Sequence, residues 1–248
     1  MIKTEGIILG EIRYKDTSKI LNIYTKDLGK ISVMAQGAYK PKSQLIAISQ
    51  PFSYCEFQLQ KGKSFYYISQ ADLIDSFYSI RENMERIGYG FYILELLEKS
   101  TEKDEANEKL FLLLEKGLKI LSSLESDYLK FIIAYEIKFV SFLGYRPFVN
   151  SCVVCNRELS SSYRFSKYLG GVLCNECKSQ DLQSKNINEN FLKGYNELLY
   201  ASLDSIDQVN ISKDTLIRLH EILVEYILFN IERNEFKSLN LIKSLLDK

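Results

Sequence analysis

Short apolar stretches separated by turn sequences fill the first 75 positions of the chain. They are TEGIILGEIRY, KILNIYT, KISVMAQGA, FSYCEFQLQ and SFYYISQADL, all rich in β-branched and aromatic residues. In the third stretch Ile31, Val33 and Ala35 occupy every second position, which is the period of a half-buried strand. KDTS, KDLG and KGK are short connections, whereas YKPKSQLIAISQP before the fourth stretch is long. Five short strands with one long loop predict a small closed barrel, such as the five-stranded OB-fold.

Beyond residue 75 the apolar residues recur at steps of three and four, the spacing of one face of an α-helix. Two such patterns cover residues 110–121 and 128–142. Gly144 is suited to the left-handed cap of the second helix, and Pro147 cannot continue that helix. The same spacing predicts three further helices, at about 189–203, 213–232 and 236–246.

These patterns predict an α+β protein of two domains. Residues 1–76 are expected to form an OB-like β-barrel that binds nucleic acid, and residues 77–248 an all-α domain. An insert at about 146–180 interrupts the helical pattern and holds four of the five cysteines. The longest apolar run, FIIAYEIKFVSFL, contains Glu136 and Lys138, so no membrane span is expected. The first residues lack the pattern of a signal peptide, and we expect a cytoplasmic protein.

Charge is distributed unevenly, although the formal net charge of the whole chain is zero. Residues 1–70 carry ten lysine or arginine side chains against five acidic ones, a balance of +5 that leaves −5 for the remainder. Residues 146–178 are again positive. Such asymmetry is typical of proteins with a polyanionic partner, but from charge alone a solvated basic surface is the simpler interpretation.

The strongest motif is CVVCNRELSSSYRFSKYLGGVLCNEC, which covers residues 152–177. Its spacing is C-x2-C-x18-C-x2-C, in which each of two tight turns presents two thiolates, the ligand set of a tetrahedral zinc site. Disulfides are the alternative, and a cytoplasmic location disfavours them. Four sulfur ligands leave no position for a reactive water molecule, so we expect one structural zinc ion rather than a catalytic one. The predicted ligands are Cys152, Cys155, Cys174 and Cys177.

Two further residues have ordinary structural interpretations. His220 lies among leucines and isoleucines in IRLHEIL, where a hydrogen-bonded core residue is commoner than a catalytic base. Cys55 lies in the fourth predicted strand and is expected to be a buried, inert thiol. The sequence has neither a phosphate-binding glycine loop nor a nucleophile motif, and we predict no catalytic residue and no enzymatic activity.

The order of these features resembles the RecO family of bacterial recombination and repair proteins. The resemblance rests on GIILGEIRYKDTSKILNIYTKDLGKISVMAQGAYKPKS with the following QPF, on FVSFLGYRPFVNSCVVC and GGVLCNEC, and on YILFNIERNEFKSLNLI. It implies a non-catalytic recombination mediator that binds single- and double-stranded DNA in the nucleoid and anneals strands coated by single-stranded-DNA-binding protein. It also implies that the protein acts with RecR to load the RecA recombinase, and that the four cysteines hold zinc.

Basic side chains near the predicted strand ends and in the long loop are the candidates for DNA contact. Lysine contacts with phosphates give affinity without sequence preference, and aromatic rings can stack on any base. A merely solvated surface would contain the same residues. We predict phosphate contacts from Arg13, Lys15, Lys26, Lys30, Lys40 and Lys42, stacking by Tyr39, and an extension of the basic surface through Arg164 and Lys167.

Other functions share these ingredients. A zinc-ribbon OB-fold protein of translation or transcription would also combine a nucleic-acid-binding barrel with a four-cysteine site. An enzyme that uses His220 together with the zinc ion is a second alternative, and a pure interaction scaffold is a third. Annealing of protein-coated DNA strands separates a recombination mediator from an RNA-specific binder.

Overall fold

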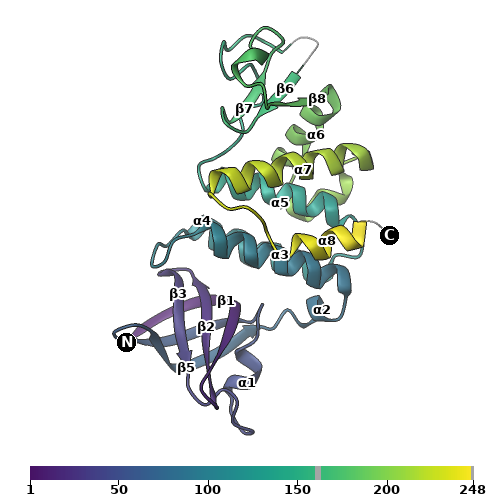
Figure 1. Ribbon diagram of the computed structural model, residues 1–248. Coiled ribbons are helices and arrows are strands. Elements are labelled where there is room, and N and C mark those ends of the chain that lie inside the picture. The colour runs from purple at the N-terminus through teal and green to yellow at the C-terminus, as the bar shows by residue number, and fades with distance from the viewer. Residues whose placement is uncertain (160–162, 247–248) are drawn as a thin grey trace. The chain divides into compact units, whose positions relative to one another are not determined.

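The computed structural model describes residues 1–159 and 163–246, and Figure 1 shows their helices and strands. Packing divides the chain into two compact units: Met1–Leu124 together with the segment from Phe236 onward, and Glu125–Glu235. The expected division after residue 76 falls inside the first unit and stays a prediction about domains. Residues 160–162 of the expected insert and 247–248 at the end of the chain lie outside the described residues. Within the described ranges, no helix is long and apolar enough to cross a membrane.

A closed five-stranded barrel forms the beginning of the first unit (Figure 1). Its strands are β1 (Ile2–Tyr14), β2 (Ser18–Thr25), β3 (Gly29–Ala35), β4 (Tyr54–Lys61) and β5 (Tyr66–Asp75). They pair in the order β1-β2-β3-β5-β4, and β4 pairs with β1 to close the ring. Every pair is antiparallel except β3 with β5, which is parallel. The predicted OB-like barrel is therefore confirmed.

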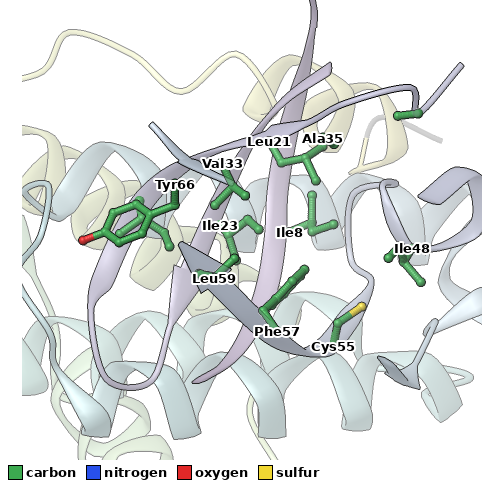
Figure 2. Close-up of a cluster of buried hydrophobic side chains, with 12 residues drawn as sticks. Ile8, Leu21, Ile23, Val33, Ala35, Ile48, Cys55, Phe57, Leu59 and Tyr66 are labelled. Atoms are coloured by element: carbon green, nitrogen blue, oxygen red, sulfur yellow. The ribbon is translucent and has the colours of Figure 1, made fainter. Parts of the chain in front are cut away.

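Alternate residues of the strands fill the interior of the barrel, as Figure 2 shows. Leu21 and Ile23 of β2 and Val33 of β3 are completely buried, in agreement with the two-residue period of the sequence. Phe57 and Cys55 of β4 are also inaccessible to solvent. Burial raises the pKa of the Cys55 thiol to about 12, which confirms the interpretation of this cysteine as a core residue.

Helices complete the first unit. They are α1 (Leu45–Ile48), α2 (Tyr78–Arg81), α3 (Met84–Ser100), α4 (Glu108–Ser123) and α8 (Leu239–Leu246). The Asn83 side chain caps α3 by accepting hydrogen bonds from backbone N–H groups of the first turn. Near the other end of α3, the Glu95 carboxylate accepts hydrogen bonds from the backbone N–H groups of Lys237 (2.9 Å) and Ser238 (2.8 Å). These contacts hold the segment that leads into α8 against α3, although the two are more than 140 positions apart in the sequence.

The second unit combines helices with a small sheet. Its helices are α5 (Tyr128–Phe142), α6 (Glu189–Tyr200) and α7 (Lys213–Asn230), with the 3-10 turns η1 (Lys178–Gln180) and η2 (Leu203–Gln208). Its strands are β6 (Tyr163–Ser166), β7 (Gly171–Leu173) and β8 (Lys185–Ile187), in the order β7-β6-β8. The part predicted to be all-α therefore carries a three-stranded sheet, of which β6 and β7 lie in the cysteine insert and β8 follows it.

The end of α5 follows the prediction closely. Gly144 has a φ of +88°, and its N–H donates to the carbonyl of Ser141 (3.3 Å). The N–H of Tyr145 donates to the carbonyl of Val140 (2.9 Å), which completes a Schellman cap. The predicted starts of α6 and α7 agree with the structure, whereas three other boundaries differ by two or three residues: α6 ends at Tyr200 because Ala201 is extended, α7 ends at Asn230, and α8 begins only at Leu239.

Candidate nucleic-acid interface and metal centre

Three connections of the barrel surround a cleft of about 1080 Å³. They are the β1–β2 turn (residues 15–17), the loop from β3 to α1 (residues 36–44) and the β4–β5 turn (residues 62–65). The first two meet because β2 and β3 are antiparallel, so that the start of β2 lies beside the end of β3. The third joins them because β5 begins beside β3, with Tyr66 opposite Val33.

Glycines allow two of these connections to turn tightly. Gly37 has a φ of +71°, a conformation that favours glycine, and its carbonyl accepts the N–H of Lys40 (3.0 Å). Gly62 leaves no room for a side chain, because a Cβ there would lie 2.6 Å from the Tyr67 ring and 2.8 Å from the Phe65 carbonyl oxygen. A lysine that lines the cleft follows each of these tight turns: Lys40 after Gly37, and Lys63 after Gly62.

The lining of the cleft is basic and aromatic. Among the residues that the structure describes there, no aspartate or glutamate is present. Its cations are Lys15, Lys40, Lys42 and Lys63, and its aromatic rings are Tyr14, Phe65 and Tyr67. All four lysines are exposed. A strip of ammonium groups beside aromatic faces is a combination that suits a polyanion carrying flat bases.

Tyr39 lies in the loop that borders the cleft and is held by neighbouring cations. Its ring centre lies 4.8 Å from Nζ of Lys19 and 5.6 Å from Cζ of Arg13. Its backbone N–H donates to the carbonyl of Thr17 (3.0 Å), which links the loop to the β1–β2 turn. Lys19 is itself buried and pairs with Glu11. With 43% of its surface exposed, Tyr39 keeps an accessible ring in an ordered position.

Two predicted contact residues have other partners and do not line this cleft. Lys26 lies in the β2–β3 turn, where its ammonium group is 3.4 Å from the Glu108 carboxylate. Lys30 donates hydrogen bonds to the backbone carbonyls of Glu98 and Thr101 at the end of α3. A cation at a helix C-terminus compensates carbonyls that have no partner within the helix. Lys30 thus fastens α3 to the barrel.

The two predicted residues of the insert belong to the second unit. Arg164 donates hydrogen bonds to the Ser184 hydroxyl (2.8 Å), the Ser184 carbonyl and the Asn186 side chain (3.0 Å), so its guanidinium joins β6 to the segment around β8. Lys167 lies over the rings of Tyr168 (5.5 Å) and Phe229 (5.8 Å). Arg164 therefore has a structural role, whereas Lys167 remains at the surface of its unit.

Lys63 is not among the contacts predicted from the sequence, although it lines the cleft together with the predicted Lys15, Lys40 and Lys42. The signal was present in KGKSFYY, where two lysines and three aromatic residues surround a glycine turn. The sequence does not show that the β4–β5 turn lies beside the β3–α1 loop, because these two connections meet only through the pairing of β3 with β5.

The four predicted cysteine ligands come together in the second unit. Their Sγ atoms all lie within 4.8 Å of one another, and those of Cys155 and Cys174 are 3.8 Å apart. A tetrahedron with metal–sulfur distances of about 2.3 Å has edges of about 3.8 Å, so the four sulfurs can hold a metal ion. All five cysteines lie in the described part of the chain, and all are free thiols. The disulfide alternative is not realised.

Hydrogen bonds favour thiolate character in part of this cluster. Burial favours the neutral form of Cys152, but backbone N–H groups, including that of Cys174 at 3.5 Å, donate to its sulfur and lower its pKa to about 6. Burial and the neighbouring thiols raise the pKa of Cys177 to about 12. Four thiolates so close together repel one another, and a cation is what allows all of them to lose their protons.

His220 has the structural environment expected for it. Its Nδ1 lies 3.1 and 3.2 Å from the two carboxylate oxygens of Glu136, and both residues are buried in the second unit. They come from α7 and α5, which pack against each other. The histidine is therefore a hydrogen-bonded core residue.

The fold and the sites define an OB-barrel protein that carries a helical unit and a four-cysteine cluster of the metal-binding type. Two family models match the chain: Recombination protein O N terminal over residues 1–77 and Recombination protein O C terminal over residues 81–240.

Curated relatives match along the full length of the chain. The DNA repair protein RecO of Alkaliphilus metalliredigens is 37% identical over 245 residues, which is 99% of this chain and 100% of the relative. The DNA repair protein RecO of Acetivibrio thermocellus is 32% identical, covering 98% of this chain and 97% of the relative. The same protein of Bacillus pumilus is 34% identical over 91% and 88%. The chain belongs to the RecO family, as the resemblance implied.

The structural role of Lys30 predicts the behaviour of a variant. Lys30→Met keeps much of the side-chain volume but removes a charged donor from two carbonyls at the end of α3. We expect the free energy of unfolding to fall by about 1.5–3 kcal/mol in urea denaturation followed by circular dichroism. Lys119→Met on the exposed face of α4 is the matched control, with an expected change within about 0.5 kcal/mol. Unchanged stability of the Lys30 variant would contradict the structural role.

Proposed function

We propose that this RecO-family protein is a non-catalytic recombination mediator of DNA repair. It binds single- and double-stranded DNA through the barrel, anneals complementary strands coated by single-stranded-DNA-binding protein, and helps RecR to load the recombinase onto such strands. It would act in the cytoplasm, at the nucleoid. The observation that carries the proposal is the lysine-lined cleft at one end of an OB-type barrel.

The chemistry of the cleft supports binding without sequence preference. Ammonium groups contact phosphates, which every sequence shares, and aromatic rings stack on any base. Neither group reads the edges of base pairs, as a mediator that acts throughout a chromosome requires. The proposed contacts are Lys15, Lys40, Lys42 and Lys63 of the cleft lining, together with Arg13 and the stacking residue Tyr39, which contact each other outside that lining. Lys26, Lys30 and Arg164 are left out because their charged groups already have partners in the protein.

We further propose that Cys152, Cys155, Cys174 and Cys177 hold one zinc ion. An all-cysteine set suits zinc and leaves no ligand position for water or substrate, which supports a structural role. The ion would join the turn at residues 152–155 to the turn at residues 174–177, beside the hydrogen bond from the N–H of Val153 to the carbonyl of Val172 (2.8 Å) and the Arg157–Glu176 ion pair. Its binding would contribute folding free energy to the insert rather than a reactive group.

DNA binding through the cleft is tested by the salt dependence of affinity. Replacing Lys40 and Lys42 by alanine removes two cations from the lining. For single-stranded DNA, the slope of log K against log salt concentration should become shallower by about 1.4, because each phosphate contact contributes about 0.7. The measurement is fluorescence anisotropy of a labelled oligothymidylate at several salt concentrations. Lys109→Ala/Lys119→Ala, on the exposed surface of α4, changes the net charge equally and should leave the slope unaltered.

A variant slope equal to that of the native protein would exclude the cleft as the interface. A loss of slope in the α4 control as large as that in the cleft variant would indicate attraction by the overall charge instead.

The proposed zinc site predicts a change in metal content. Cys174→Ser should reduce bound zinc from about one ion per chain to a small fraction of that value, because a hydroxyl replaces one of four thiolates. Inductively coupled plasma mass spectrometry of the purified protein measures this directly. Cys55→Ala is the matched control, since this cysteine is buried in the barrel and remote in sequence from the cluster. Full zinc content in the Cys174 variant, or loss in the Cys55 variant, would contradict the assignment.

A further inference from the structure

A second, smaller cleft adjoins the first one on the barrel. Its volume is about 110 Å³, and residues of three segments line it: the beginning of β3, the end of β4 with the β4–β5 turn, and the loop between α3 and α4. Gly62, Lys63, Ser64 and Phe65 line both clefts. The β4–β5 turn is therefore a ridge with one cleft on each side.

The α3–α4 loop reaches this cleft because Lys30 and its neighbours hold it there. The Lys30 side chain donates to carbonyls at the end of α3, as described above. The backbone N–H of Asp104 donates to the Lys30 carbonyl (3.0 Å), and Lys30 and Lys103 form an isolated parallel β-bridge. Lys103 is thus placed at the barrel surface by backbone contacts, although it is distant from the barrel strands in sequence.

The second cleft continues the basic character of the first. Its exposed cations are Lys61, Lys63 and Lys103, and Asp104 is the one acidic residue among the described residues that line it. The Lys61 ammonium lies 5.9 Å from the ring centre of Tyr66, which keeps it at the wall of the cleft. Lys30 also lines this cleft, but its ammonium serves the carbonyls of α3 and is not counted as a ligand group.

We propose that a single DNA strand held in the first cleft continues over the β4–β5 turn into the second cleft, where Lys61 and Lys103 bind its phosphates. The proposal rests on the proposed function. It adds to that function the course of the DNA strand along the barrel and a second group of residues that bind the strand. This path favours single-stranded over double-stranded DNA. To pass from one cleft to the other, the DNA must bend sharply over the β4–β5 turn, which is only four residues long. Duplex DNA, with a persistence length of about 150 base pairs, resists such bending, whereas a single strand does not.

Oligothymidylates of two lengths test the path. A strand of about 6 nucleotides is short enough to fill the first cleft alone, and one of about 16 nucleotides is long enough to reach the second. In Lys61→Ala/Lys103→Ala the salt slope for the longer strand should become shallower by about 1.4, while that for the shorter strand stays unchanged. In Lys40→Ala/Lys42→Ala both slopes should fall. Lys109→Ala/Lys119→Ala again serves as the control of equal charge.

The outcomes separate this inference from the proposed function. Unchanged slopes for both lengths in the Lys61/Lys103 variant, together with reduced slopes in the Lys40/Lys42 variant, would overturn the second binding segment and leave the first cleft standing. An equal fall for both lengths in the Lys61/Lys103 variant would also overturn the path, because it would reflect general attraction. Unchanged slopes in both variants would overturn the path and the proposed interface together.

Discussion

The parallel pairing of β3 with β5 is the contact on which the arrangement of the first unit depends. It joins Val33 to Tyr66 and Met34 to Tyr67, and these two residue pairs turn an open sheet into a closed barrel. Without this pairing β3 and β5 would be exposed edges, which proteins generally avoid. Met34 and Tyr67 line the larger cleft and Tyr66 lines the smaller one, so the contact that closes the barrel also forms part of both clefts.

Two kinds of lysine in this chain have different roles. Some supply charged donors to backbone carbonyls that lack partners: Lys30 does so at the end of α3, and Lys138 at the end of α6 through the carbonyls of Leu198 (3.2 Å) and Leu199 (3.1 Å). Others, such as Lys40 and Lys63, stand exposed on connections of the barrel. We propose that lysines of the second kind contact the DNA. The neutral net charge of the chain conceals this division.

The five barrel strands, five of the helices and the cysteine cluster could be predicted from the sequence, because each depends on residues close together in the chain. The 17-residue helix α3 and the strands β6, β7 and β8 were not predicted. Alternation at Ile31, Val33 and Ala35 is a local signal, and so is each C-x-x-C pair. The partners of individual lysines depend on distant residues and could not be predicted. Lys30 contacts carbonyls 68 and 71 positions away, and the turn holding Lys63 becomes part of the larger cleft only when the barrel closes. Three of the nine DNA contacts predicted from the sequence therefore have partners within the folded chain: Lys26, Lys30 and Arg164.

We propose that this member of the RecO family uses the lysine-lined cleft of its barrel to bring DNA strands together. The most direct measurement is the rate at which complementary strands, each coated with single-stranded-DNA-binding protein, form duplex in the presence of the purified chain. The native protein should anneal the strands rapidly, and the Lys40→Ala/Lys42→Ala variant should anneal them markedly more slowly. Absence of annealing by the native protein, or an undiminished rate in the variant, would contradict a role of this cleft in annealing.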